Sequence, residues 1–240
     1  MTLYENSEWC IDSAVAEIHE NELLSFSQTG AWWSAIERFA IALESRNARC
    51  EAGTQAALGN ENIHNKTLTA STKDYIKSIA LGGMEIDRYF AEEAIEELGE
   101  ERYVELVGIV ARLAHLDIFA KGIGISPLAL LEPTDDVSPP QQRPSEAKDE
   151  GFFVASVPPA PDGGGDLARW IYGGDFPAAN ILRSLSLVPE EARRLNTIID
   201  QEYCSMTQIM DMEYSPQPPL SRPQVELIAA RVSALNDCFY

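Results

Sequence analysis

Positive charge is scarce in this 240-residue sequence. Lysine and arginine together number 18 against 38 aspartates and glutamates, which gives a formal net charge of −20. Such a surface repels phosphate backbones and anionic lipids, so the composition argues against nucleic-acid binding and against binding at a membrane surface. No apolar run has the length of a transmembrane helix, and the N-terminus lacks the basic and apolar regions of a secretory signal. We therefore expect a cytoplasmic protein.

Cysteine is also infrequent. The four cysteines are too sparse for a disulfide scaffold, and none of them forms a Cys-x-x-Cys pair that could hold zinc. They are Cys10, Cys50, Cys204 and Cys238. We expect Cys50 and Cys204 to be packed in the core rather than reactive, because small buried thiols behave as hydrophobic side chains.

Histidine is limited to His19, His64 and His115. These residues form no His-x-x-x-His or His/Asp cluster, so the sequence predicts neither a metal site nor a bound cofactor. His19 and His64 lie in polar surroundings, and we expect them to be solvated. His115 lies within an apolar stretch and is expected to be a partly buried histidine bonded to a neighbouring group, with a proton-shuttle role as the alternative.

Apolar residues recur at helical spacing in many segments of the sequence, which predicts an all-α fold. The stretch 101–121 is apolar nearly all round, which is typical of a central buried helix. The expected helices lie within or near residues 21–50, 73–81, 84–98, 101–121, 167–172, 178–187, 190–212 and 221–235.

Residues 124–166 interrupt this pattern because they hold eight of the fourteen prolines and end in three glycines. Such a composition cannot propagate a helix or a strand and is typical of a linker or of an extended arm. We therefore expect two helical units, 1–123 and 167–240, on either side of a linker at 124–166.

The last helix carries the most suggestive chemistry. Ser221 and Gln224 have the spacing of a capping box, and apolar residues at helical spacing follow from Val225. Glu226 and Cys238 are twelve residues apart, which on one unbroken helix separates them by about 18 Å. A bend at residues 236 and 237 would let the carboxylate fold back toward the sulfur, as a proton relay to a thiol requires.

This pattern resembles the AhpD-like alkylhydroperoxidase and carboxymuconolactone decarboxylase superfamily. Redox members of that superfamily carry a glutamate, eleven residues, a cysteine, two residues, a second cysteine, three residues and a histidine. Glu226 and Cys238 match the first two positions, and the sequence ends at Tyr240, before the second cysteine. The stretch AANILRSLS at 178–186 and the following Val-Pro-Glu are similar to the lead-in helices of peroxidase-related members.

The resemblance implies tandem AhpD-like helical repeats, the second of them incomplete. It implies Cys238 and Glu226 as catalytic residues of a thiol-dependent peroxidase, with a small-molecule peroxide as substrate and a thiol as reductant. Without the second cysteine this activity is impaired, so the alternative is a non-catalytic helical assembly module that keeps the fold. Cys238 would then be a small buried hydrophobic residue.

A weak internal repeat supports a tandem arrangement. Glu37 to Asn47 can be laid over Glu226 to Asn236, and each copy has a cysteine shortly afterwards. The first copy has Gly53 in place of a second cysteine, so it is expected to be structural. Because the apolar residues of the last helix have no later helices to cover them, we expect a homo-oligomer with this helix at the interface.

Overall fold

The structure is a computed structural model that describes residues 3–5, 7–53, 67–82, 86–134, 137–176, 178–216, 218–235 and 238. Within these ranges the chain forms α-helices and no strand, which confirms the predicted all-α class. Lys148 and Ser156 form an isolated antiparallel β-bridge. Among the described residues, no helix combines the length and the apolar character needed to cross a bilayer.

Most helices fall within or near the expected ranges, but the single expected stretch 21–50 contains the end of α1 and most of α2, and α8 is shorter than expected. Their bounds are α1 Ser13–Phe26, α2 Ala35–Glu51, α3 Ala70–Leu81, α4 Arg88–Leu98, α5 Glu100–Gly122, α6 Gly165–Tyr172, α7 Asn180–Arg183, α8 Pro189–Glu202 and α9 Arg222–Leu235, with a short 3-10 helix at Ala160–Asp162.

Local sequence explains where several helices begin and end. Ser34 and Glu37 form a complete capping box at the start of α2, and the Asp87 side chain accepts the Phe90 N–H at the start of α4. Gly99, with φ of 84°, separates α4 from α5 in a positive-φ conformation that other residues adopt at a cost. These local signals therefore fix the starts of α2 and α4 and the break between α4 and α5.

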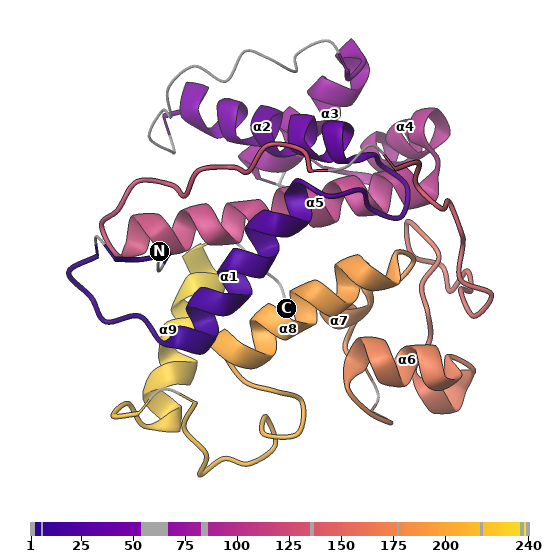
Figure 1. The fold of residues 1–240 in the computed structure, drawn as a ribbon. Coiled ribbons are helices and arrows are strands. Elements are labelled where there is room, and N and C mark those ends of the chain that lie inside the picture. The colour runs from indigo at the N-terminus through magenta and orange to yellow at the C-terminus, as the bar shows by residue number, and fades with distance from the viewer. Residues whose placement is uncertain are drawn as a thin grey trace. The chain divides into compact units, whose positions relative to one another are not determined.

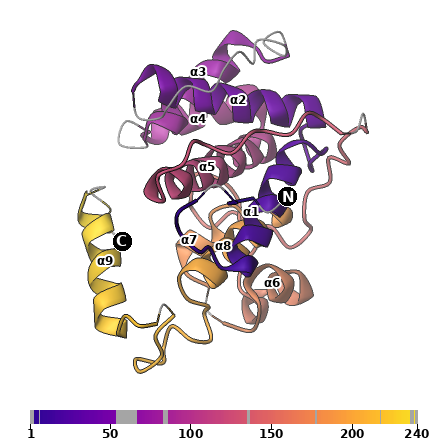
Figure 2. The same cartoon turned by 60° about the vertical axis from the view of Figure 1, so that its left-hand side comes forward.

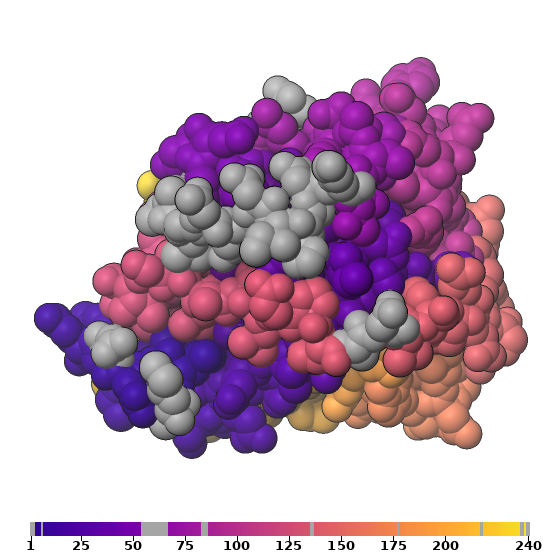
Figure 3. Space-filling view, turned by 45° about the horizontal axis from the view of Figure 1, so that its top comes forward, coloured from indigo at the N-terminus to yellow at the C-terminus, as the bar shows by residue number. Residues whose placement is uncertain are grey.

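The chain divides into two compact units, Met1–Asn196 and Thr197–Tyr240. This division differs from the expected one, in which a linker at 124–166 separated units 1–123 and 167–240. The proline-rich segment belongs to the first unit because its backbone is bonded there: the Thr134 N–H donates to the Ser27 carbonyl at 2.8 Å and the Gln141 N–H to the Ala31 carbonyl at 2.9 Å. In Figure 3 this segment crosses the surface of the first unit as an extended band.

Helix α5 lies at the centre of the first unit, as its apolar sequence predicted. Figures 1 and 2 both show α2, α3 and α4 on one side of it and α1 and α7 on the other. The buried residues around it come mainly from α1, α2, α3 and α5, and they include Phe26, Trp33, Ile41, Ile76, Leu106, Ile109 and Leu113. The core thus depends on the two longest helices, α2 and α5.

The first part of the chain departs from the prediction. Helix α1 begins at Ser13, eight residues before the expected helical stretch, and it buries polar residues that weaken its apolar period. His19, expected to be solvated, is fully buried: its Nδ1 is hydrogen-bonded to the Tyr4 hydroxyl, and its ring meets the Phe119 ring edge-on at 4.7 Å. His115 is partly buried, as expected. His64 lies outside the described residues.

The second unit contains the end of α8, an irregular stretch and α9. Helix α8 ends at Glu202 rather than at Met212, because the Tyr203 and Cys204 N–H groups both bond the Ile199 carbonyl and close the helix there. At the start of α9 the Gln224 side chain accepts the Ser221 N–H at 2.8 Å, one half of the predicted capping box. Of the predicted apolar stripe only Val225 is buried, whereas Ile228 is 55% exposed and Leu235 is 64% exposed.

Candidate functional site

Glu226, the predicted relay residue, lies in the first turns of α9 and is bonded on two sides. Its carboxylate oxygens accept the Tyr203 hydroxyl at 2.9 and 2.8 Å, and one of them accepts Arg222 Nε at 2.5 Å. Arg222 is four residues earlier on the same helix, so both side chains project from one face. The hydrogen bond from Tyr203 and the charge of Arg222 lower the pKa of Glu226, which keeps this carboxylate ionised at neutral pH.

Arg222 connects this carboxylate to a thiol. Its Nη1 lies 3.9 Å from Cys204 Sγ and also donates to the Asp211 carbonyl, while Nη2 donates to the Ile209 carbonyl. These bonds fix the guanidinium in place. Burial raises the pKa of Cys204, and Arg222 acts in the opposite direction. The second unit therefore contains a connected set of Tyr203, Glu226, Arg222 and Cys204, which we call the Cys204 network.

Cys238 lies apart from this network. It follows the end of α9, is exposed, and its N–H donates to the Ser233 carbonyl at 2.9 Å. Glu226 precedes the last residue of α9 by nine positions, which is about 13 Å along the helix axis. Residues 236 and 237, where a bend was predicted, lie outside the described residues. In the described part of the second unit, Glu226 is connected through Arg222 to Cys204 instead.

The proposed first copy of the motif has a different local role. Glu37 is the third residue of α2, where its carboxylate caps the helix and pairs with Arg102 at 2.9 Å. Glu226 is the fifth residue of α9 and has no capping role of this kind. Cys50, near the end of α2, is partly buried, in the direction of the predicted packing role. The two glutamates therefore have different roles: Glu37 caps its helix, whereas Glu226 bonds Tyr203 and Arg222.

A second chemically unusual region, unforeseen in the sequence, lies in the first unit. Five charged side chains from α1, α2, α5 and α8 are at most 4% exposed and form a continuous cluster. They are Glu22, Arg38, Glu105, Arg112 and Glu191, and we call them the buried charge cluster.

The contacts in the cluster alternate in sign. Arg112 pairs with Glu22 and donates Nε to Glu191 at 3.1 Å. Arg38 donates to Glu191 at 3.0 Å and pairs with Glu105, whose other oxygen accepts the Trp32 N–H at 2.6 Å. Each carboxylate therefore has at least one guanidinium partner, which is the condition under which buried charges are tolerated.

The pKa values of the two central carboxylates, Glu105 and Glu191, shift in opposite directions. Burial raises the pKa of Glu105 to about 6, aided by the nearby charge of Glu191 and opposed by Arg38. Burial acts on Glu191 in the same direction, but Arg112 and Arg38 together outweigh it and lower the pKa of Glu191. Near pH 6 the cluster can therefore take up or release a proton at Glu105 while Glu191 remains ionised.

The sequence predicts Cys204 to be a core residue within a long helix, so Cys204 is not among the predicted site residues. Burial is confirmed, since Cys204 is 3% exposed, but the residue lies just beyond the end of α8. One signal was present: Arg222 and Glu226 have the spacing of a helical ion pair, which marks a face of α9 that carries charge rather than apolar packing.

Comparison of the chain with protein-family models, with curated proteins and with solved structures found no match. The resemblance to the AhpD-like superfamily therefore rests on the residue pattern of Glu226 and Cys238 and on the stretch 178–190.

Proposed function

We propose that the second unit supports thiol-dependent reduction of hydroperoxides, with Cys204 as the reacting thiol and with Arg222 and Glu226 as the residues that prepare it. The observation that favours this function is the position of the Arg222 guanidinium, 3.9 Å from Cys204 Sγ and held by the Glu226 carboxylate. A fixed cation beside a sulfur stabilises the thiolate, which is the nucleophilic form of cysteine. The AhpD-like residue pattern points to the same class of reaction.

The reaction would proceed in two stages. The Cys204 sulfur attacks one peroxide oxygen, the O–O bond breaks, and the leaving alkoxide takes the thiol proton and departs as an alcohol, so that Cys204 becomes a sulfenic acid. One thiol of a reductant then condenses with the sulfenic acid and releases water. A second reductant thiol attacks the resulting disulfide and restores Cys204.

The Cys204 network would act on the first stage. Arg222 faces both the thiolate and the negative charge that develops on the leaving oxygen, and an oriented guanidinium stabilises such charge. Glu226 and Tyr203 hold Arg222 in that orientation. Because burial raises the pKa of Cys204, the thiol form dominates at neutral pH and the rate should rise as the pH rises.

Substrate and compartment follow from this chemistry. The substrate class is a small hydroperoxide, and the reductant is a low-molecular-weight or protein thiol. A reducing cytoplasm would supply that thiol, and no disulfide joins any of the four cysteines, all of which the structure describes.

Trapping of the sulfenic acid tests the assignment. The reduced protein is treated with cumene hydroperoxide in the presence of dimedone, and the labelled cysteines are located by mass spectrometry. We expect the adduct on Cys204. An adduct on Cys238 would instead support the residue that the sequence pattern selected, and labelling confined to Cys10 or Cys50 would refute the site in either form.

A matched pair of substitutions tests whether Glu226 contributes more to the reaction than an acidic residue outside the Cys204 network. We expect Glu226→Gln to slow peroxide consumption, because the amide holds Arg222 less firmly, and Glu213→Gln to have no effect, because Glu213 is an exposed acid of the same unit. Equal rates for the two variants would remove Glu226 from the mechanism.

The exposed apolar residues of α9 favour a second candidate function, a helical module that assembles with a second copy of itself. Ile228 and Leu235 lie seven residues apart on one face of α9, and both are more than half exposed. Pairing of this face with the same face of another chain would bury both side chains, each worth about 1.5–3 kcal/mol when fully buried.

Light scattering distinguishes this module from a monomeric enzyme. We expect the protein to form a dimer or larger oligomer at micromolar concentration and Leu235→Asp to dissociate it. Ala230→Asp is the control, because Ala230 is exposed on the opposite side of α9. A monomer of 26.5 kDa in every case would exclude the assembly role.

A further inference from the structure

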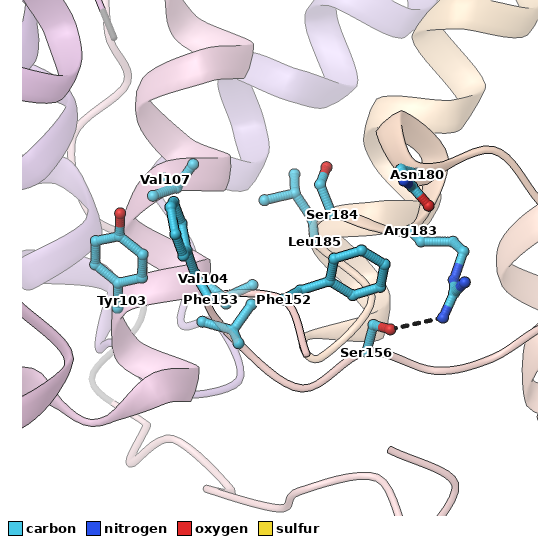
Figure 4. Close-up of a pocket in the computed structure, with 11 residues that line it drawn as sticks. Tyr103, Val104, Val107, Phe152, Phe153, Ser156, Asn180, Arg183, Ser184 and Leu185 are labelled. Carbon is cyan, nitrogen blue, oxygen red and sulfur yellow. Dashed lines mark hydrogen bonds between the residues drawn. The ribbon is translucent and has the colours of Figure 1, made fainter. Parts of the chain in front are cut away.

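An apolar cavity of about 260 Å³ lies in the first unit, and none of its lining residues is a cysteine. Its wall is formed by α5, by α7 with the residues that follow it, and by the loop that contains Phe152 and Phe153. Figure 4 shows the two phenylalanine rings between Tyr103 on α5 and Arg183 on α7. The other lining residues include Val104, Val107, Ser156, Asn180, Ser184 and Leu185.

The cavity has a buried floor and an aromatic rim. Val104 is 2% exposed and Leu185 is 4% exposed, whereas Phe152 and Phe153 are 44% and 45% exposed. Half-exposed aromatic side chains beside an apolar cavity lack apolar contacts that a bound ligand would supply. The rings themselves are held in place, because the Arg183 guanidinium lies 5.6 Å from the Phe152 ring centre and Arg88 lies 5.1 Å from that of Phe153.

Arg183 supplies the polar group of this site. Its Nη2 pairs with Glu150 and donates to Ser156 Oγ at 2.9 Å. Its Nε is buried and has no acceptor among the described residues. A buried N–H without an acceptor is unfavourable, and an oxygen atom of a bound molecule would satisfy it.

We propose that this cavity binds a small neutral molecule that has an apolar body, such as one aromatic ring with a short chain, and one carbonyl oxygen that accepts the Arg183 Nε–H. The volume fits this size, because a cavity of about 150 Å³ can hold benzene and pockets for drug-sized ligands begin at about 300 Å³. A neutral ligand is favoured over an acid because Glu150 already pairs with Arg183 and the chain carries a net charge of −20. This site is independent of the proposed thiol chemistry.

Three probes of one shape test the chemistry of the ligand. They are 4-phenylbutan-2-one, which carries a ketone, propylbenzene, which carries no oxygen, and 3-phenylpropanoate, which carries a charge. In calorimetric titrations of the full chain we expect saturable binding with one site, strongest for the ketone. Tighter binding of the carboxylate would overturn the preference for a neutral ligand, and no saturable binding of the ketone would overturn the site.

Substitutions then locate the binding. Arg183→Lys keeps the positive charge but lacks the Nε–H, so we expect ketone affinity to fall about tenfold, the equivalent of one hydrogen bond to a charged donor, with propylbenzene affinity unchanged. Val107→Phe fills the cavity and should abolish binding of both probes. Ile118→Phe, an exposed position on the same helix, is the control and should bind as the unchanged protein does.

Phe152→Ala keeps the test decisive if Val107→Phe disturbs packing, because it removes one aromatic wall from an exposed loop. We expect it to weaken binding of both probes while the thermal midpoint stays unchanged. If Phe152→Ala and Ile118→Phe bind the ketone equally well, the ligand lies elsewhere and the proposal is refuted. An unchanged ketone affinity in Arg183→Lys would refute the role of Nε.

Discussion

Arg112 offers the most direct test of the buried charge cluster. Its side chain is fully buried on α5 and donates to Glu22 and Glu191, which come from α1 and α8. Arg112→Met keeps an unbranched side chain but leaves both carboxylates without this partner. Removal of one member of a buried ion pair typically costs about 3–5 kcal/mol, a large part of a usual stability of about 5–15 kcal/mol.

Urea denaturation at pH 7 measures this loss, and a thermal scan should show a midpoint lower by roughly 6–20 °C for a chain of this size. Arg169→Met is the matched control. Arg169 pairs with Asp166 and Asp175, but it is 49% exposed and its partners more so, and pairs of that kind are worth about 0–1 kcal/mol.

The pH dependence of the loss identifies its cause. Arg112 is one of the two charges that lower the pKa of Glu191, so without it Glu191 is buried with less compensation, and a lower pH, which favours the neutral form, relieves part of the penalty. We therefore expect the difference between Arg112→Met and the unchanged protein to be smaller at pH 4 than at pH 7. A loss no larger than that of Arg169→Met, or a loss independent of pH, would refute this account of the cluster.

Two further predictions concern the same region. Folding raises the pKa of Glu105 from 4.5 to about 6, so between these pH values the folded state holds a proton that the unfolded chain has released. The free energy of unfolding should therefore fall by about 2 kcal/mol as the pH rises from 4.5 to above 6. Glu105→Gln should flatten this part of the pH profile in urea denaturation experiments. Gly108→Ala should destabilise the protein by about 1–3 kcal/mol, although alanine is the better helix former, because the new Cβ would lie 2.5 Å from Glu191 Oε2. Gly122→Ala, whose Cβ would have no neighbour within 4 Å, should change stability by less than about 1 kcal/mol; equal effects in denaturation experiments would show that the space at Gly108 does not matter.

The sequence was sufficient for elements that depend on local signals. Helix α5 follows a glycine and is apolar nearly all round, and its predicted bounds of 101 and 121 are each within one residue of the observed ones. Helix α2 also has a capping box at its start, but the predicted stretch 21–50 begins fourteen residues before Ala35 and does not use that signal. A capping box did predict the start of α9. Local signals could not predict the end of α8, because its last turn is closed by backbone bonds of Tyr203 and Cys204 that no side-chain pattern encodes.

Buried charges were beyond the reach of sequence patterns for a different reason. An arginine is normally a surface residue, but Arg38 is buried because Glu105 and Glu191 pair with it from positions 67 and 153 residues away. The pairing of Arg222 with Cys204 also joins residues separated by an irregular stretch. In both cases the partner determines the environment, and the partner is not visible in the local sequence.

Glu191 has a consequence for the order in which the first unit can fold. It is the shared partner of Arg38 and Arg112, which precede it by 153 and 79 residues, so a chain emerging from the ribosome contains α1 to α7 before it contains this carboxylate. Until α8 is made, closure of α1 and α2 on α5 would leave Arg38 paired with Glu105 and Arg112 with Glu22, but both guanidiniums would lack the acceptors that Glu191 supplies, and a buried N–H without an acceptor costs free energy. Contacts of such long sequence separation also form slowly, because large loops must close first. We therefore expect nascent chains that stop before Pro189 to stay open and to expose their apolar core, so that the last helix to be synthesised in the first unit allows the earliest ones to pack.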